Sequence, residues 1–213
     1  MQHTVNNEPI IMNQLPVPVL HGLIVCGGKS LRMGTDKSML IYQQEPQRYH
    51  LYKMLTPICE QVFISCNAMQ LNEMDDGYNT LVDLPAYENT GPMAALLTAF
   101  TYYPNNDLLV IGCDYPFLSG NDLHAFLQHC KAGAPAAFYH DKADLYEPLI
   151  AYYPCSSMSA LLEMHMNGQY SLQQFLKNNN ALKYFPENKK SIIGINTIED
   201  YYKTKELISL HEK

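Results

Sequence analysis

The most constraining feature of this sequence is an apolar run that opens into adjacent glycines and then into two basic residues. Residues 23–25 are apolar, Gly27 and Gly28 follow, and Arg32 and Lys37 come shortly after them. Glycine lets backbone N–H groups approach an anion closely, and basic side chains neutralise the charge of that anion. The segment therefore predicts a strand followed by a phosphate-binding loop, and it favours a nucleotide triphosphate as the ligand.

Two common phosphate-binding motifs do not fit this segment. The Walker A motif needs a glycine five residues before its second glycine, and Leu23 stands there when Gly28 is taken as the second. The dinucleotide fingerprint G-x-G-x-x-G fails because Gly27 and Gly28 are adjacent. The loop must belong to another class of nucleotide-binding protein.

Composition and charge narrow the class of protein. The 213 residues are 47% hydrophobic with a net charge of −7, which argues against a general binder of nucleic acid or of anionic membranes. Residues 1–18 lack the basic start and long apolar stretch of a signal peptide, and no run is long enough for a membrane helix. We expect residues 1–18 to be a flexible extension and residues 19–213 to form a single domain.

The cysteine pattern indicates the cellular compartment. The six cysteines include no C-x-x-C pair, and several lie in apolar runs where cysteine behaves as a small hydrophobic residue. This predicts reduced, buried thiols in a cytoplasmic protein. The eight histidines show no zinc-binding spacing.

The apolar patterns alternate between short runs typical of strands and longer runs with helical spacing. Strands are predicted at residues 21–26, 61–66, 79–82, 107–113, 134–140, 146–152 and 191–195. Helices are predicted at 48–58, 93–102, 119–130, 158–166 and 171–176, and Thr197 is expected to cap a final helix. This alternation predicts a three-layer, Rossmann-like α/β fold with a mostly parallel, doubly wound sheet.

Polar residues follow several of the predicted strands. Asn67 follows the second strand, Asp83 the third, and Asp114 the most apolar one, while Gly91 opens a helix after Asp83. In open α/β sheets, ligands bind outside the carboxyl ends of the strands. We therefore expect these residues to gather around the glycine loop.

The chemistry of this set is coherent. Attack on the α-phosphate of a nucleotide requires positive charge around the triphosphate, which Arg32 and Lys37 would supply. It also requires a divalent cation for the departing pyrophosphate, and Mg²⁺ binds one carboxylate together with phosphate oxygens. Asp114 is the predicted metal ligand, and Asn67 and Asp83 are predicted to read base or sugar edges.

The sequence resembles the molybdenum cofactor guanylyltransferases of the MobA type. Residues 23–37, LIVCGGKSLRMGTDK, are similar to the family signature L-x-x-G-G-x-x-x-R-M-G-x-D-K. Further similar segments follow in the family's order: GPMAAL at 91–96, CDYPFL at 113–118, EPLIAY at 147–152, SLQQFL at 171–176 and INTIED at 195–200. Together they cover roughly residues 20–203.

This resemblance implies GMP transfer from GTP to the terminal phosphate of a molybdenum-bearing molybdopterin, with Mg²⁺ as cofactor. It also implies transient contacts with molybdenum-insertion or molybdoenzyme-maturation proteins. The implied catalytic residues are Arg32, Lys37 and Asp114, with Asp114 on the metal. The implied binding residues are Val25, Cys26, Gly27, Gly28, Lys37, Asn67, Asp83, Gly91, Asp114 and Asn196, the last in the region associated with the pterin.

Two alternatives stay open beside this interpretation. One is another nucleotidyltransferase, of the cytidylyl or sugar-phosphate type, because the loop residues alone do not fix the base. The other is a non-catalytic nucleotide-binding accessory protein, because Gly194 stands where the family usually has an asparagine.

Overall fold

The computed structural model describes residues 18–26 and 36–211 of the chain. Within these residues, seven strands form one sheet in the order β3-β2-β1-β4-β6-β5-β7. Strands β1 to β4 are mutually parallel, β5 and β7 are parallel to each other, and β6 runs antiparallel to its neighbours β4 and β5. The strands are β1 (Leu20–Val25), β2 (Gln61–Cys66), β3 (Thr80–Val82), β4 (Asp107–Gly112), β5 (Ala136–His140), β6 (Leu145–Tyr153) and β7 (Leu182–Tyr184).

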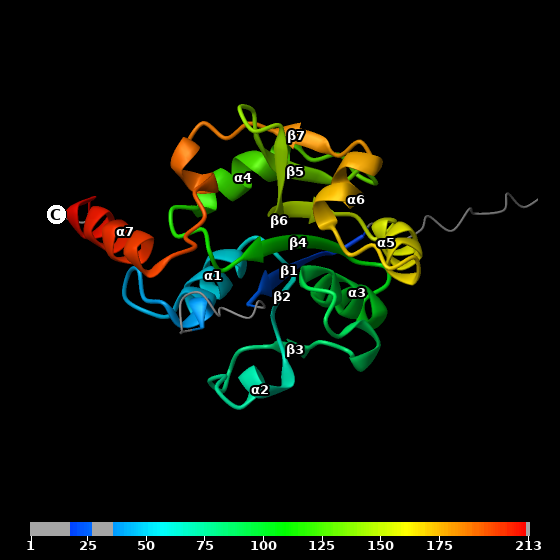
Figure 1. Cartoon of the computed structure of the whole chain (residues 1–213), viewed down its shortest axis with the longest axis horizontal. Coiled ribbons are helices and arrows are strands. Elements are labelled where there is room, and N and C mark those ends of the chain that lie inside the picture. Colours follow the sequence, from blue (N-terminus) through cyan, green and yellow to red (C-terminus); the bar gives the residue numbers. More distant parts are fainter. Residues whose placement is uncertain (1–17, 27–35, 212–213) are drawn as a thin grey trace, which may run out of the picture.

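Helices cover both faces of the sheet, so the predicted three-layer α/β fold is confirmed (Figure 1). One face carries α1 (Gln47–Leu55) and α4 (Gly120–His129), and the other carries α3 (Pro92–Tyr102), α5 (Ser157–Met166) and α6 (Leu172–Asn178). The shorter elements are α2 (Ala68–Leu71) and the 3₁₀ helices η1 (Lys37–Met39), η2 (Pro85–Tyr87) and η3 (Lys189–Ile192).

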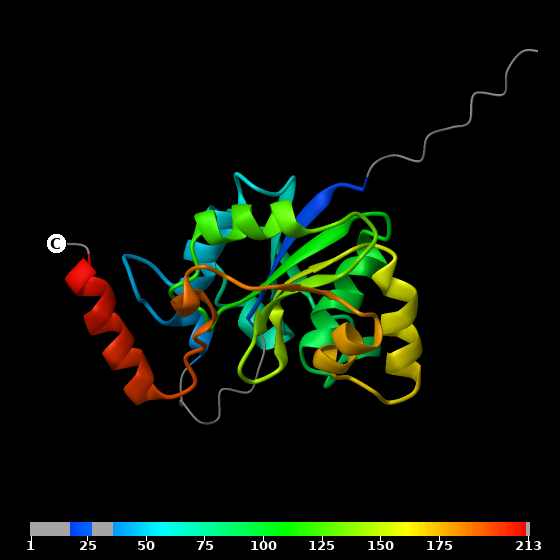
Figure 2. The same cartoon turned by 90° about the horizontal axis from the view of Figure 1, so that it is seen from above.

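The last helix, α7 (Ile198–His211), lies apart from the sheet in both views (Figures 1 and 2). It packs through Ile198, Tyr201 and Ile208 against a small apolar cluster formed by Leu40, Tyr42 and Ile195. The cap predicted for this helix is present, because Asp200 N donates to Thr197 Oγ1 over 3.1 Å. None of the helices within the described residues has both the length and the apolarity needed to cross a bilayer.

The core lies on both faces of the central strands. Leu23 of β1 belongs to the cluster that includes α3, and its neighbour Ile24 belongs to the cluster that includes α1. Residues 108–111 of β4 are at most 1% exposed. A strand buried on both faces reads as a continuous apolar run, which is why this strand was predictable from sequence.

The topology fixes where a ligand can bind. Strand β1 lies between β2 and β4, and the connections leaving it and returning to β4 carry α1 on one face and α3 on the other. The strand order therefore reverses at the β1–β4 boundary, and open α/β sheets bind ligands at such a switch point, beyond the carboxyl ends of the strands. We call this end of the sheet, marked by Cys26, Asn67, Asp83 and Asp114, the carboxyl edge.

Two sequence-based predictions need correction or stay untested. The strand predicted at residues 191–195 is wrong: Ser191 N bonds to Asn188 O and Ile193 N to Lys190 O, so the segment starts in the 3₁₀ helix η3. The short β7 occupies the edge of the sheet instead and was not predicted. The expected extension over residues 1–18 lies outside the described residues except for Pro18, so the domain boundary stays a prediction.

Candidate functional site

The strand ends at the switch point are buried and in contact. Val25 is 4% exposed and Cys26 6%. The Cys26 Sγ lies 3.5 Å from Sγ of Cys113, the residue that follows β4. All six cysteines fall in the described part of the chain and are free thiols. The carboxyl ends of β1 and β4 therefore lie side by side, and Asp114 follows directly after Cys113.

Three predicted loop residues, Gly27, Gly28 and Arg32, lie outside the described residues. The described chain resumes at Asp36, which caps η1 by accepting a hydrogen bond from Ser38 N over 2.9 Å. This cap fixes the backbone of Lys37, the basic residue that ends the loop. The structure therefore positions the far end of the predicted phosphate-binding segment.

Lys37 reaches the carboxyl-terminal part of the chain. Its Nζ donates to Asn196 Oδ1 over 2.8 Å and to the carbonyl of Ile195 over 3.0 Å. The same residue, Ile195, donates its backbone N–H to the carbonyl of Asp114 over 2.8 Å. Lys37, Asp114 and Asn196 were predicted from three distant segments, and the structure brings them together.

The surroundings of Asp114 disfavour the ionised form of its carboxyl group. Burial raises the pKa of its carboxyl, and nearby Glu147 adds to this, whereas a backbone hydrogen bond and the Lys37 ammonium oppose the shift. A partly desolvated carboxylate favours binding of a positive ion, because the ion relieves the desolvation cost.

The donor set at Asp114 fits Mg²⁺. Among the described residues no group of three histidine, cysteine or acidic side chains forms a complete metal site. Mg²⁺ does not need one, since it commonly takes one or two carboxylates and fills its other positions with substrate phosphates and water. A Cβ at Gly194 would lie 3.6 Å from Asp114 Oδ2, so glycine at this position places no side chain against that oxygen.

Asn67 is tied to the end of the glycine-loop segment through Gln70. The Asn67 Oδ1 accepts from Gln70 N over 2.9 Å, and the Gln70 Nε2 donates to Asp36 Oδ2 over 2.7 Å. Both Asp36 and Gln70 were missed as site residues. Asp36 stands in the family-like motif one residue before Lys37, so its position was a usable signal, whereas nothing in the sequence singled out Gln70.

Asp83 and Gly91 lie farther along the carboxyl edge, beyond β3. The Asp83 carboxylate accepts from Ser65 Oγ over 3.0 Å. Burial raises the pKa of Asp83, while the Ser65 hydrogen bond opposes this rise and Glu88 adds to it. Gly91 precedes α3 with φ at +63°, a left-handed conformation that favours glycine. Both residues follow β3, the edge strand that β2 separates from β1, so they mark a second part of the carboxyl edge.

A second group at this edge also escaped prediction. Glu147, near the start of β6, accepts a hydrogen bond from the Tyr115 hydroxyl over 2.5 Å and contacts His140 Nε2. Glu147 begins the family-like segment at 147–152, but that resemblance gave it no role in the site. Its position near Asp114 arises because β6 runs antiparallel to β4.

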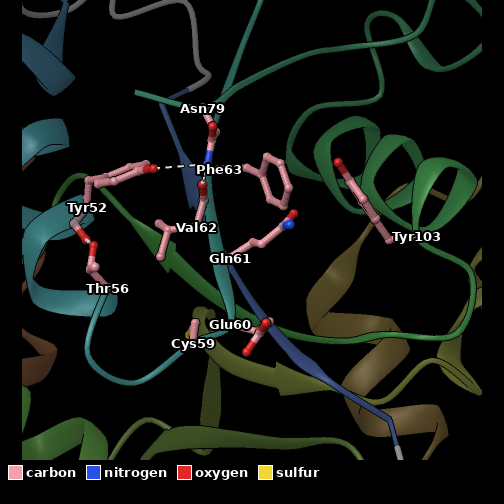
Figure 3. Close-up of a pocket in the computed structure, with 9 residues that line it drawn as sticks. All are labelled: Tyr52, Thr56, Cys59, Glu60, Gln61, Val62, Phe63, Asn79 and Tyr103. Carbon is pink, nitrogen blue, oxygen red and sulfur yellow. Dashed lines mark hydrogen bonds between the residues drawn. The ribbon is translucent and has the colours of Figure 1, made fainter. Parts of the chain in front are cut away.

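A cavity of about 280 Å³ lies elsewhere, at the opposite ends of the strands (Figure 3). It is lined by Tyr52, Thr56, Cys59, Glu60, Gln61, Val62, Phe63, Asn79 and Tyr103. Part of its polar lining is paired internally, because Asn79 Nδ2 contacts the Tyr52 hydroxyl over 3.1 Å. None of these lining residues was predicted for the site, and the cavity is remote from the carboxyl edge.

Comparison with known proteins identifies the family. Residues 22–183 match the model of the MobA-like NTP transferase domain. The chain is 30% identical over 184 residues to a molybdenum cofactor biosynthesis bifunctional protein of Synechocystis, covering 85% of this chain but only 52% of that protein. It is 28% identical to a molybdenum cofactor guanylyltransferase of Pasteurella multocida, covering 84% of this chain and 95% of that enzyme.

The fold also has a clear counterpart among solved structures. Molybdopterin-guanine dinucleotide biosynthesis protein A from Archaeoglobus fulgidus superposes with a TM-score of 0.72 at 22% identity, covering 89% of this chain and 99% of that one. The resemblance inferred from the motifs is confirmed: the chain belongs to the MobA-like NTP transferase family and is a nucleotidyltransferase.

Proposed function

We propose that this chain transfers GMP from GTP to the terminal phosphate of molybdenum-bearing molybdopterin and releases pyrophosphate. An oxygen of the acceptor phosphate bonds to the α-phosphorus of GTP while the bond from that phosphorus to the oxygen bridging to the β-phosphate breaks. The family and the named guanylyltransferases among its relatives support this reaction. The observation that carries the proposal is the convergence of Lys37, Asp114 and Asn196 at the switch point of the sheet.

In this proposal the cations act on the triphosphate. The Lys37 ammonium contacts the phosphates, and Arg32 adds positive charge from the loop. A fixed cation beside the transferred phosphoryl group stabilises the negative charge that builds on the departing pyrophosphate. The cap from Asp36 keeps Lys37 in place while the nucleotide enters.

Asp114 is the residue that would hold Mg²⁺. When bound there, Mg²⁺ would supply charge neutralisation between the phosphates. The carboxylate itself orients the complex, since it is held at the end of β4 by the Ile195 hydrogen bond to its backbone carbonyl.

The guanosine half of the substrate lies along the remaining carboxyl edge in this proposal. The backbone at Val25, Cys26, Gly27 and Gly28 approaches the nucleotide, while Asn67 and Asp83 contact the base and sugar and Gly91 borders them. The hydrogen bonds of Asn67 with Gln70 and of Asp83 with Ser65 support fixed side-chain positions for such contacts.

The acceptor half is proposed to meet Asn196. Asn196 accepts a hydrogen bond from Lys37, the residue proposed to contact the GTP phosphates. The acceptor bound at Asn196 would therefore lie next to the bound nucleotide. Gly194 leaves space next to Asp114, Tyr115 and Asn196, since a Cβ there would lie 3.6 to 3.8 Å from the nearest atoms of all three. Glycine at 194 therefore adds no side chain between Asp114 and Asn196, where the two substrates would meet in this proposal.

We also propose that the protein works in the cytoplasm and makes transient contacts with proteins of molybdenum insertion or molybdoenzyme maturation. Its six free thiols support a reducing compartment.

A thermal-shift panel with GTP, CTP, ATP and UTP, each with Mg²⁺, tests the nucleotide assignment. A ligand that binds the native state raises the apparent melting temperature by mass action. We expect the largest rise with GTP, and a loss of most of that rise in Asp114→Asn. A larger rise with CTP or UTP would favour the cytidylyl or sugar-phosphate alternative.

Pyrophosphate release in the presence of the acceptor separates an enzyme from an accessory protein. The proposal predicts release that depends on both GTP and acceptor and is lost in Asp114→Ala while the fold is kept. GTP binding without any release under these conditions would support the non-catalytic alternative.

A further inference from the structure

Glu147 links two groups at the carboxyl edge. Its Oε2 accepts a hydrogen bond from the Tyr115 hydroxyl over 2.5 Å, and its Oε1 contacts His140 Nε2. The Glu147 side chain is only 18% exposed. The residue that follows Asp114 is therefore fastened to a different strand.

An irregularity in the β5–β6 hairpin accompanies this link. Ala137 pairs with Ala151, but the next residue of β5, Phe138, pairs with Glu147, so β6 carries three extra residues, 148–150, at this point. Such bulges recur beside active sites, where they re-aim a side chain. The bulge brings Glu147 to the carboxyl edge next to the turn after β4.

The same bulge packs against the end of β4. A Cβ on Gly112 would lie 3.1 Å from Leu149 Cβ and 2.8 Å from Asp114 Oδ1. Leu149 and the Asp114 carboxylate thus both lie close to the Gly112 backbone. Together with the bond from Ile195 N to the Asp114 carbonyl, these contacts hold the Asp114 turn from several sides.

We infer that Glu147 is a positioning residue that, through Tyr115, fixes the Asp114 carboxylate in the orientation that receives the metal–GTP complex. His140 holds Glu147 from its other oxygen. This inference rests on the proposed metal role of Asp114. Residues that orient a metal ligand without touching the metal typically change its affinity or activity by about 10- to 100-fold when they are removed.

The chain offers a closely matched control at the other end of the same strands. Tyr152 of β6 donates to Asp107 Oδ2 over 2.5 Å, the same bond type and length as the Tyr115–Glu147 pair. Tyr152 is 7% exposed and Tyr115 is 5% exposed. Tyr115→Phe and Tyr152→Phe therefore remove equivalent bonds, but only one of them lies next to Asp114.

The test measures Mn²⁺ binding by the 213-residue chain with saturating GTP, from the electron paramagnetic resonance signal of free Mn²⁺, together with thermal melting. We expect Tyr115→Phe and Glu147→Ala to weaken Mn²⁺ binding by about tenfold or more. Tyr152→Phe should leave it unchanged while lowering the melting temperature about as much as Tyr115→Phe. Glu147→Gln should stay near wild type, because its amide oxygen still accepts from Tyr115 and its NH₂ group still faces His140.

Equal Mn²⁺ affinity in Tyr115→Phe and Tyr152→Phe would overturn the positioning role. So would a Glu147→Gln defect as large as that of Glu147→Ala, which would make Glu147 a direct ligand. Asp114→Asn serves as the reference: if it keeps wild-type Mn²⁺ affinity, the metal role in the proposed function fails. If it loses Mn²⁺ and Tyr115→Phe does not, the failure belongs to Glu147 alone.

Discussion

Lys37 Nζ lies 2.8 Å from Asn196 Oδ1, although 159 positions separate the two residues in the chain. The contact joins the end of the glycine-loop segment to the segment that precedes α7. Lys37 also donates to the Ile195 carbonyl, and the Ile195 N–H donates to the Asp114 carbonyl. These hydrogen bonds connect Lys37 to Asp114 through Ile195. The contact therefore places a residue of the proposed nucleotide side directly beside one of the proposed acceptor side.

Replacing Lys37 by methionine keeps the aliphatic stem and removes the charge. A hydrogen bond to a charged group contributes about 1.5–3 kcal/mol, which corresponds to roughly a 10- to 100-fold change in affinity. We expect GTP affinity, measured by calorimetry, to fall within this range and the transfer rate to fall with it. Lys205→Met is the control, since the Lys205 ammonium donates to the Tyr201 hydroxyl over 3.4 Å and has no part in the proposed site. Unchanged GTP affinity in Lys37→Met would remove Lys37 from the triphosphate site.

Gly112→Ala should damage the site through Asp114 itself. The new methyl would lie 2.8 Å from Asp114 Oδ1, closer than ordinary contacts allow, so the carboxylate must move. Overpacking of this kind costs about 1–3 kcal/mol of folding free energy, and the moved carboxylate should reduce metal-dependent transfer further.

The control for that variant is Gly120→Ala at the first residue of α4. The nearest atom to a Cβ there is Met54 Cγ at 3.9 Å, so the methyl fits. We expect unchanged or slightly higher stability in urea unfolding, with full transfer activity. Wild-type activity in Gly112→Ala would show that the position of the Asp114 carboxylate is not critical.

Asp83→Asn should reveal the cost of burying that carboxylate. Burial raises the pKa of Asp83 in the folded protein above its unfolded value, so the folded state keeps its proton to higher pH. Stability associated with Asp83 is therefore full at acidic pH and lost as the pH rises through the folded pKa. The asparagine variant should be more stable than wild type at neutral pH, and this gain should shrink as the pH falls.

Urea unfolding of wild type and Asp83→Asn between pH 4 and 8 measures this difference. Asp141→Asn, on the exposed turn between β5 and β6, is the control and should show no comparable trend. A gain that is the same at every pH would contradict a buried, charged Asp83. Because Asp83 is proposed to contact the guanosine, we also expect Asp83→Asn to bind GTP more weakly than wild type at neutral pH, where the variant is the more stable protein.

Asn196→Ala should separate the acceptor from the nucleotide. We expect the KM for the molybdopterin acceptor to rise by about tenfold, the change expected when one good hydrogen bond to a charged group is lost, while the KM for GTP changes less. Asn178→Ala is the control, since the Asn178 side chain accepts from Gln174 Nε2 on the exposed surface of α6. A defect confined to GTP would place Asn196 on the nucleotide side.

Much of the fold was predictable because local patterns agree with it. The buried run of β4 and the Ser119 capping box of α4 each carry their own signal. The segment at 191–195 misled because Ile192, Ile193 and Ile195 are β-branched residues typical of strands, while its backbone bonds to Asn188, Lys190 and Asp114 instead of a neighbouring strand. Tertiary partners decide such short segments.

The site residues also differ in whether local sequence could predict them. Lys37 and Asp114 stand in motifs that mark their own positions, whereas the Tyr115–Glu147 bond requires the β6 direction and the bulge register, neither of which local sequence specifies. The periodicity of apolar residues shows which face of a strand each residue lies on. It does not show which residue of a distant strand pairs with it.

The most direct test of guanylyl transfer uses GTP labelled at the α-phosphate, Mg²⁺ and molybdenum-bearing molybdopterin with the purified chain. We predict that the label moves to the acceptor in an amount equal to the pyrophosphate released, that labelled CTP serves far less well, and that Asp114→Asn loses the transfer. Equal or better transfer from CTP, or wild-type transfer by Asp114→Asn, would contradict this account.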